Sequence, residues 1–290
     1  RHAQRPAINL FMGDPQGILQ EIQLKIARQE RLSFSDGVAL FESPDLLAIG
    51  AMAHAVRQRL HGFRAFYALN LHLNPTNICT TRCEFCAFSR DAGDLDAYAL
   101  TLDEIEARVK RAVAEGINEV HLVGGHNPEL GLEYYLEMIR RIRAIQGAAS
   151  LFMKAFSAPE IDFMSRRSGL PWTEVLQRLK EAGLDGMPGG GAEIFDAEVR
   201  RKLCPDKISA EEWLGVHRVA HGLGIRTNAT LLYGHIETAE QRVAHLLKLR
   251  ELQDETGGFL AFVPLAFNPR NSALKGVQET SGFLDLKMLS

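Results

Sequence analysis

The chain has 290 residues, of which 46% are hydrophobic and 24% charged, and its formal net charge is −3. This composition is typical of a globular protein with a large core. The small net charge gives no support to a nucleic-acid partner or an anionic-membrane partner, and we find no apolar run long enough to span a bilayer. We therefore expect a small-molecule ligand, with no nucleic acid and no membrane.

Residues 1–6 are basic, but no apolar segment typical of a signal peptide follows them. They lack an initiator methionine, from which we expect a trimmed or incomplete amino terminus. Of the four cysteines, Cys79, Cys83 and Cys86 are clustered and Cys204 is remote. A disulfide framework would be denser and spread along the chain, so the pattern indicates reduced thiols in a cytoplasmic protein.

Two amphipathic helices are predicted first, over residues 15–30 and 44–61. In the second, Ser43 is the expected N-cap and Pro44 the first helical residue. Six apolar, strand-like runs then alternate with helical patterns, at 69–74, 118–123, 150–155, 184–187, 225–232 and 259–265. The helical patterns lie near 102–115, 131–145, 172–182, 195–203, 209–223 and 238–255.

Alternating strands and helices predict a parallel α/β sheet, and six such units suggest a barrel or an open part of one. We expect a helical extension over residues 1–62 that packs on a main domain over residues 63–290. In such architectures the chemistry gathers at the carboxyl ends of the strands. The unusual tracts each follow one predicted strand, at 79–86, 124–126, 157–160, 188–193, 233–237 and 264–271. They predict one shared active site on that rim.

Cys79, Cys83 and Cys86 are the most specific feature. Three thiolates can ligate three corners of a [4Fe–4S] cluster and leave the fourth iron open for chemistry. The alternative is a zinc site, which needs a fourth ligand, and His72 or Cys204 would have to supply it from outside the loop. Otherwise Cys204 is expected to be a buried, inert thiol.

The remaining tracts each leave two interpretations open. Gly124 and Gly125 form either a tight turn or bare backbone that binds an ammonium group. The glycine run 189–191 is either a nest of N–H groups for an anion or a flexible loop. Glu193, which ends this tract, either holds ribose hydroxyls or favours the start of the next helix.

Three polar residues are similarly ambiguous. Ser157 and Glu160 either cap a helix or bind a cofactor. Asn228 falls on the predicted inner face of the fifth strand, where either a ligand or core hydrogen bonding would satisfy its amide.

The spacing of Cys79, Cys83 and Cys86, with Phe85 before the third cysteine, resembles the radical S-adenosylmethionine superfamily. The resemblance implies an α/β fold, a (βα)6 partial TIM-like barrel. It also implies a [4Fe–4S] cluster whose open iron binds the amino and carboxylate groups of S-adenosylmethionine, a consumed cosubstrate. Reduction of the cluster would cleave the sulfonium and yield a 5′-deoxyadenosyl radical. Phe85 would shield the cluster and stack on a ligand ring.

Further tracts resemble the enzymes of the futalosine route to menaquinone, at 72–77, 86–90, 188–195, 233–238 and 252–259. Two radical enzymes of this route share much of the pattern, aminofutalosine synthase and its near alternative, cyclic dehypoxanthine futalosine synthase. Greater similarity to the first is found at residues 36–41, 89–90 and 227–230. Deazaflavin-precursor synthases are more distant. The resemblance covers residues 15–287, and the family usually continues past the position of Ser290, so we expect a further carboxyl-terminal segment.

This resemblance implies that the radical adds to the enol-ether double bond of 3-[(1-carboxyvinyl)oxy]benzoate, giving aminofutalosine, methionine and bicarbonate. An electron donor such as flavodoxin or ferredoxin is the implied partner. The implied site residues fall into three groups: catalytic His126, His235 and Arg90; cofactor-binding Phe85, Gly124, Gly125, Ser157, Glu160, Glu193 and Asn228; and substrate-binding Gly189, Gly190, Gly191, Tyr233 and Arg270. A non-catalytic iron–sulfur or zinc protein remains the alternative of a different class.

Overall fold

The computed structural model describes residues 15–290, which fall into two compact units. One unit contains the described residues up to Ala65 together with Ser281–Ser290, and the other is Phe66–Thr280. No helix within residues 15–290 is both long enough and apolar enough to cross a membrane.

The first unit is helical. Its helices are α1 (Pro15–Ala27), α2 (Phe34–Glu42), α3 (Leu46–His61) and α11 (Gly282–Leu289). Leu19, Ile22, Ile49 and Met52 form its small core, so α1 and α3 each contribute one apolar stripe. The sequence predicted α1 and α3 and missed the two shorter helices, α2 and α11.

The predicted start of α3 is wrong in detail. Asp45, not Ser43, is the N-cap, and its carboxylate accepts a hydrogen bond of 2.9 Å from the Ala48 N–H. Ser43 instead closes α2, and Pro44 lies before the helix. An aspartate side chain satisfies the exposed N–H groups of a first turn as well as a serine does, which is why the cap moves by two residues.

The second unit contains one parallel sheet in the order β1-β2-β3-β4-β5-β6. Its strands are β1 (Asn70–Leu73), β2 (Glu119–Leu122), β3 (Phe152–Ala155), β4 (Gly186–Met187), β5 (Arg226–Tyr233) and β6 (Phe259–Ala266). Its helices are α4 (Leu102–Ala114), α5 (Leu132–Ala144), α6 (Ala158–Ser168), α7 (Trp172–Ala182), α8 (Ala197–Leu203), α9 (Ala210–Gly222) and α10 (Ala239–Thr256). All six predicted strands are confirmed, and α6 is added.

Local sequence explains where the helices begin and end. Ser209 and Glu212 form a reciprocal capping box at the start of α9, in which each side chain accepts a hydrogen bond from the other residue's backbone N–H. Gly257 ends α10 in the left-handed conformation, which only glycine adopts without strain. These boundaries keep the connections to the strands short, so that the strand ends gather at one edge of the sheet.

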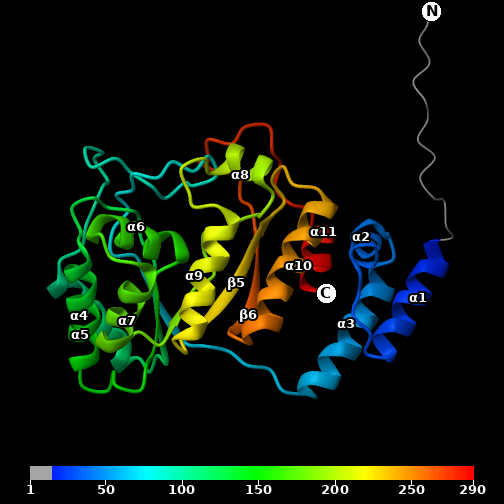
Figure 1. Cartoon of the computed structure of the whole chain (residues 1–290), viewed down its shortest axis with the longest axis horizontal. Helices are drawn as coiled ribbons and strands as arrows, with labels where there is room; N and C mark the ends of the chain where they lie inside the picture. Colours follow the sequence, from blue (N-terminus) through cyan, green and yellow to red (C-terminus); the bar gives the residue numbers. More distant parts are fainter. Residues whose placement is uncertain (1–14) are drawn as a thin grey trace, which may run out of the picture. The chain divides into compact units, whose positions relative to one another are not determined.

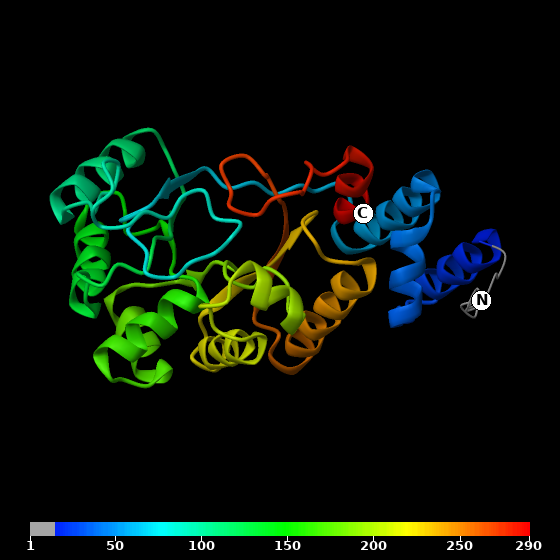
Figure 2. The same cartoon turned by 90° about the horizontal axis from the view of Figure 1, so that it is seen from above.

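The helices cover one face of the sheet, and the other face is open. Leu73, Leu122 and Met153 point to the helices and belong to one large core. Because side chains alternate along a strand, His72 and His121 point to the opposite, inner face. Figure 1 shows β5 and β6 running between α9 and α10, with α8 above them. In the second unit the loops at the carboxyl ends of the strands, including the cyan loop after β1, lie at the top of Figure 1 and face the viewer in Figure 2.

Candidate functional site

The three clustered thiols lie in the loop that follows β1. Cys79, Cys83 and Cys86 are each half-buried and free of disulfides, whereas Cys204 is buried. The Cys79 N–H donates to the Arg90 carbonyl at 3.1 Å, so the two ends of the cysteine segment are tied together. The result is one short loop that carries three soft thiol donors on the active-site rim.

This donor set fits the cluster that the sequence predicted. Thiolates are the ligands of iron–sulfur clusters, and three of them leave one iron available to a further ligand. Within residues 15–290, no three His, Cys, Asp or Glu side chains are grouped tightly enough to enclose a metal ion. The fit therefore rests on the chemistry of the thiols and on the supports of the loop.

Gly124 and Gly125 follow β2 and pack directly against the cysteine loop. A Cβ atom on Gly125 would lie 2.2 Å from the Ile78 carbonyl oxygen and 2.9 Å from the Cys79 Cβ. The Gly125 N–H donates to the Thr76 carbonyl at 3.0 Å. Glycine is thus required at position 125, because its backbone contacts the backbone at Ile78. This contact positions Cys79, and binding of an ammonium group by the turn stays a prediction.

His126 also holds the cysteine loop. Its Nδ1 shares a hydrogen bond of 2.7 Å with the Thr81 hydroxyl, and its ring stacks on Phe163 with centroids 4.9 Å apart. Its carbonyl accepts a hydrogen bond from the Thr80 N–H at 3.1 Å. Burial, with a smaller effect of Lys207, lowers the pKa of His126 to about 4, so the ring is neutral near pH 7.

Glu160 joins the ends of β2 and β3. Its carboxylate accepts hydrogen bonds from the Gly124 N–H at 2.9 Å, the Ser157 N–H at 2.7 Å and the Ser157 hydroxyl at 2.6 Å. Burial nevertheless raises the pKa of Glu160 to about 7, although these hydrogen bonds act in the opposite direction. Ser157 and Glu160 therefore form the structural cap that the sequence allowed, and a role in cofactor binding stays a prediction.

A buried ion pair lies behind the cysteine loop. The Lys207 ammonium group is 2.6 Å from the Glu193 carboxylate and 4.9 Å from the centre of the Phe85 ring. Burial raises the pKa of the Cys83 thiol to about 12, and the strongest effect in the opposite direction is that of Lys207. Lys207 is therefore placed to stabilise negative charge on a cysteine ligand, a role that the sequence analysis missed.

Glu193 lies in a strained part of the rim. Its φ of 46° is in the left-handed region, which costs a residue with a side chain about 1–3 kcal/mol unless its surroundings hold it there. The pair with Lys207 and a hydrogen bond of 2.9 Å from the Leu232 N–H to the Glu193 carbonyl supply that support. A bond from Glu193 to ribose hydroxyls stays a prediction.

The glycine run 189–191 is packed between β5 and α6. A Cβ atom would lie 2.7 Å from the Ala229 carbonyl carbon at Gly189 and 2.2 Å from the Pro159 Cγ at Gly191. The Gly190 carbonyl accepts a hydrogen bond of 3.1 Å from the Trp213 indole. Close packing thus explains two of the three glycines, and substrate binding by the run stays a prediction.

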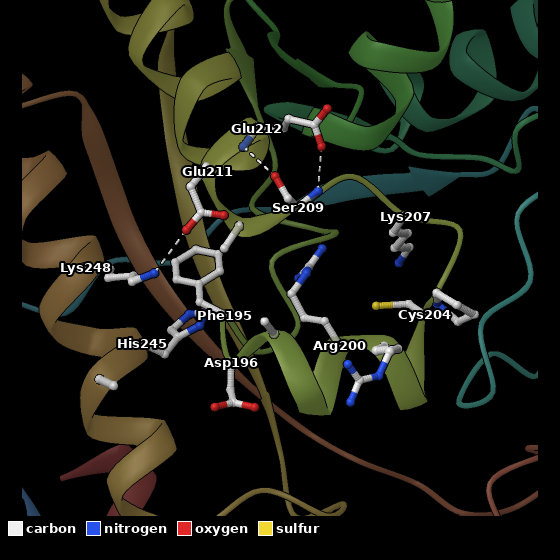
Figure 3. Close-up of a pocket in the computed structure, with 15 residues that line it drawn as sticks. Phe195, Asp196, Arg200, Cys204, Lys207, Ser209, Glu211, Glu212, His245 and Lys248 are labelled. Carbon is white, nitrogen blue, oxygen red and sulfur yellow. Dashed lines mark hydrogen bonds and ion pairs between the residues drawn. The ribbon is translucent and has the colours of Figure 1, made fainter.

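Arg200 and Cys204 line a surface pocket of about 580 Å³ on the outer side of this rim, between α8, α9 and α10. Arg200 is buried and donates to backbone carbonyls that include those of Ala192 at 2.6 Å and Ile194 at 3.1 Å. Figure 3 shows Arg200, Cys204 and Lys207 near one another on α8 and the turn after it. The Glu84 N–H donates to the Leu203 carbonyl at 2.8 Å, which ties this turn to the cysteine loop.

The two predicted arginines have partners of their own. Arg90 pairs with Asp96 at 2.8 Å and donates to carbonyls of the cysteine loop, including that of Ala87 at 3.0 Å. The Arg270 side chain is 76% exposed and lies 3.0 Å from Glu279. Arg90 thus braces the loop, and the role of either arginine toward substrate stays a prediction.

His235 and Tyr233 are buried at the end of β5. The His235 Nε2 donates to the Leu232 carbonyl at 3.0 Å, and its Nδ1 lies 3.0 Å from the Glu237 carboxylate. Burial acts to raise the pKa of Glu237, but His235, the Gly234 N–H and Arg242 lower it to about 2. Tyr233 is 4% exposed. These contacts order the rim after β5, and the catalytic role of His235 stays a prediction.

The inner face of the sheet carries several polar side chains, of which His121 and Lys154 were not singled out by the sequence. His72, His121 and Lys154 lie there on β1, β2 and β3, with Glu119 paired to Lys154 at 2.7 Å. Asn228 lies on β5, and its amide has no hydrogen-bond partner within residues 15–290, so its predicted role in cofactor binding stays a prediction. Alternation of polar and apolar residues in the short strands could have indicated this face.

Comparison with known proteins agrees with this arrangement. Residues 73–249 match the family model of the Radical SAM superfamily. Aminodeoxyfutalosine synthase of Thermus thermophilus is 47% identical over 270 residues, which are 92% of this chain and 72% of the relative. The Streptomyces coelicolor protein of the same name is 43% identical over 87% of this chain and 64% of its own length.

A relative with another name is almost as similar. The 5-amino-6-(D-ribitylamino)uracil–L-tyrosine 4-hydroxyphenyl transferase of Methanopyrus kandleri is 43% identical over 77% of this chain and 60% of its own length. This chain therefore spans between three fifths and about three quarters of the relatives described here.

Solved structures share the fold. The [FeFe]-hydrogenase maturase HydG superposes with a TM-score of 0.76 at 17% identity and covers 95% of this chain, which in turn covers 60% of HydG. Methylornithine synthase (PylB) superposes with a TM-score of 0.68 at 20% identity, covering 92% of this chain and 74% of its own. These likenesses confirm the six-stranded, partial-barrel architecture.

Proposed function

The chain belongs to the radical SAM superfamily, and from that premise we propose that it adds a 5′-deoxyadenosyl group to 3-[(1-carboxyvinyl)oxy]benzoate to form 6-amino-6-deoxyfutalosine in menaquinone biosynthesis. The observation that carries the proposal is the 47% identity to aminodeoxyfutalosine synthase over 92% of the chain. The superfamily makes the chain an enzyme with a [4Fe–4S] cluster and S-adenosylmethionine as its cofactors.

When bound, these two groups supply the 5′-deoxyadenosyl radical. Cys79, Cys83 and Cys86 would ligate three irons, and the loop is held for that task by Gly125 and His126. Because a radical carbon must meet its alkene within near-attack distance, residues that fix the loop also fix the reacting geometry.

The overall reaction balances without net oxidation. We refer to 3-[(1-carboxyvinyl)oxy]benzoate as the enolpyruvyl benzoate. Together with S-adenosylmethionine and water, it gives aminofutalosine, methionine, bicarbonate and one proton. The bond between sulfur and C5′ breaks, a bond between C5′ and the alkene forms, and the enolpyruvyl carboxylate leaves after rearrangement over the ring. The electron that starts the reaction, from a donor such as flavodoxin or ferredoxin, is returned when the carboxylate leaves.

Two alternatives use the same radical. The first is cyclic dehypoxanthine futalosine synthase, which the sequence motifs keep as the near alternative. The second is the activity in the name of the Methanopyrus kandleri relative, a 4-hydroxyphenyl transferase of L-tyrosine and 5-amino-6-(D-ribitylamino)uracil. The 43% identity to that relative favours this alternative. Non-catalytic iron–sulfur or zinc binding is the alternative of a different class.

Parallel anaerobic assays separate these functions. Each assay contains the reconstituted protein, S-adenosylmethionine and a reductant. The third component is the enolpyruvyl benzoate in the first assay, dehypoxanthine futalosine in the second, and L-tyrosine with 5-amino-6-(D-ribitylamino)uracil in the third. We expect an adenosylated product by mass only in the first assay. A product in either of the other assays alone would replace our proposal. A reduced cluster whose electron paramagnetic resonance (EPR) spectrum does not respond to S-adenosylmethionine would remove all three enzymatic functions.

A further inference from the structure

Three basic side chains form one row across the inner face of the sheet. His72 on β1 is the register partner of His121 on β2, which is in turn the partner of Lys154 on β3. Register partners on adjacent parallel strands lie side by side on the same face. The neighbours Leu71, Leu73, Val120 and Leu122 point to the helices, so the row faces away from the core.

The row is ordered without a ligand. The His72 and His121 rings are stacked, with centroids 4.8 Å apart and 26° between their planes. The Lys154 ammonium group is 2.7 Å from the Glu119 carboxylate, and their side chains are 12% and 11% exposed. Asn70 donates to the same carboxylate at 3.4 Å. Glu119 therefore fixes where the lysine charge lies.

Ring nitrogens of His72 and His121 in this row lack hydrogen-bond partners within residues 15–290. The Asn74 amide nitrogen donates to the Val123 carbonyl at 2.7 Å, and its second proton meets the His72 Nε2 at 3.3 Å. Since Nε2 accepts, the proton of neutral His72 is on Nδ1, which has no partner within residues 15–290. Neither ring nitrogen of His121 has a hydrogen-bond partner within residues 15–290, where its ring stacks on that of His72.

The His121 ring is uncharged near pH 7 and keeps an N–H that can donate to an anion. Burial is the main cause that lowers the pKa of His121 to about 4, and Lys154 and His72 act in the same direction. An imidazole that stays neutral carries one N–H donor, and Lys154 supplies the positive charge beside it.

Building on the proposed function, we propose that His72, His121 and Lys154 form the subsite for the ring carboxylate of the enolpyruvyl benzoate. The cysteine loop is on the rim, so the alkene must also lie toward the rim to meet the radical. The ring carboxylate is the anionic group at the far end of the substrate from the alkene. The row lies on the strands themselves, before the rim loops, where that far end would reach.

In this subsite the carboxylate accepts N–H bonds from both imidazoles and is attracted by the lysine charge. Hydrogen bonds to ionised groups of this kind are worth about 10- to 100-fold in affinity. The predicted catalytic residues His126, His235 and Arg90 and the predicted substrate-binding residue Arg270 are each engaged by other side chains or carbonyls. The row differs because the ring nitrogens of His121 and the Nδ1 of His72 have no hydrogen-bond partner within residues 15–290, although Lys154 is paired with Glu119.

Binding of two ligands tests the subsite. We compare the enolpyruvyl benzoate with 2-phenoxyprop-2-enoate, which keeps the alkene and its carboxylate but lacks the ring carboxylate. In the reconstituted wild-type protein we expect the first ligand to bind about 10- to 100-fold more tightly. His121→Phe keeps the stacked ring and removes its N–H, so it should abolish most of this preference while leaving iron content and binding of S-adenosylmethionine unchanged.

A second variant guards against misfolding, because Lys154→Met alone would strand the Glu119 charge. Lys154→Met with Glu119→Gln should likewise abolish the preference, and Lys110→Met, which changes an exposed lysine on α4, should retain it. A preference that persists in both inner-face variants would overturn the subsite. If the wild type forms no adenosylated product but shows the preference, the subsite stands and the proposed reaction fails.

Discussion

Lys207 and Glu193 form an ion pair of 2.6 Å in which the two side chains are only 14% and 8% exposed. Lys207 lies over the ring of Phe85 in the cysteine loop, and its charge acts to lower the pKa of the Cys83 thiol. Partly buried cations that face negative charge favour the reduced form of a cluster, since reduction adds an electron.

Lys207→Met should therefore lower the reduction potential of the cluster. It should also cost about 3–5 kcal/mol of unfolding free energy, because the Glu193 charge would be left buried without its partner. An EPR-monitored redox titration and urea unfolding measure the two effects. Lys207→Met with Glu193→Gln removes both charges and should recover much of the stability. A potential equal to that of the wild type in the single variant would mean that Lys207 acts on folding alone.

Alanine variants of the clustered cysteines and of Cys204 should differ in iron content. Alanine at Cys79, Cys83 or Cys86 should abolish cluster binding, because two remaining thiolates cannot hold the cluster. Cys204→Ala is the matched control and should retain the iron of the wild type, since its thiol is buried beside α8. Iron and sulfide are measured after anaerobic reconstitution. Equal iron loss in the Cys204 variant would instead make that thiol a ligand.

Gly125→Ala should disrupt the cysteine loop without touching a thiol. Its new methyl group would lie 2.2 Å from the Ile78 carbonyl oxygen, so one of the two backbones must move. We expect low iron content after reconstitution and a loss of activity of at least about tenfold, as small misplacements in active sites commonly cause. Gly222→Ala, at a site with open space, should keep full iron content and activity. Normal iron content in the Gly125 variant would contradict this account of the turn.

Five histidines make the protein sensitive to acid. Burial lowers the pKa of His121, His126 and His221 to about 4, that of His245 to about 3 and that of His217 well below its ordinary value. In the unfolded chain they titrate near 6.5, so between pH 6.5 and about 4.5 the unfolded state binds more protons and unfolding becomes easier as the pH falls. Glu160, with its raised pKa, acts in the opposite direction but is a single group.

Urea unfolding between pH 7.5 and 5 measures this loss. Each imidazole that stays neutral contributes about 2 kcal/mol over pH 6.5 to 5. His217→Gln should flatten the dependence by one such contribution, whereas His54→Gln, at an exposed site on α3, should leave the slope unchanged. A wild-type free energy that is constant or rises toward pH 5 would be inconsistent with buried neutral histidines.

Some of the fold and site could be read from the sequence because it is locally encoded. The buried strands are short apolar runs between helical patterns, and the three cysteines lie within one loop. The short helices α2 and α11 have no such context and were missed. Their sequences gave no separate periodic pattern long enough to stand out from the connecting segments.

The missed site residues depend on contacts that are distant in the sequence. Lys207 follows α8, and nothing in the chain shows that it meets Glu193 and Phe85. His72, His121 and Lys154 become neighbours only through the register of three strands, which a pattern within one strand does not specify. Conversely, the sequence does indicate the cap that Ser157 and Glu160 form, because that pattern spans only four residues.

The central claim is that the adenosyl carbon ends up bonded to the substrate. The most direct measurement uses S-adenosylmethionine that carries two deuterium atoms at C5′, with the enolpyruvyl benzoate and a reductant under anaerobic conditions. We predict a product by mass that contains the adenosyl group with both deuterium atoms, formed in equal amount to methionine. Deuterated 5′-deoxyadenosine as the sole nucleoside product, again in equal amount to methionine, would contradict radical addition by this chain.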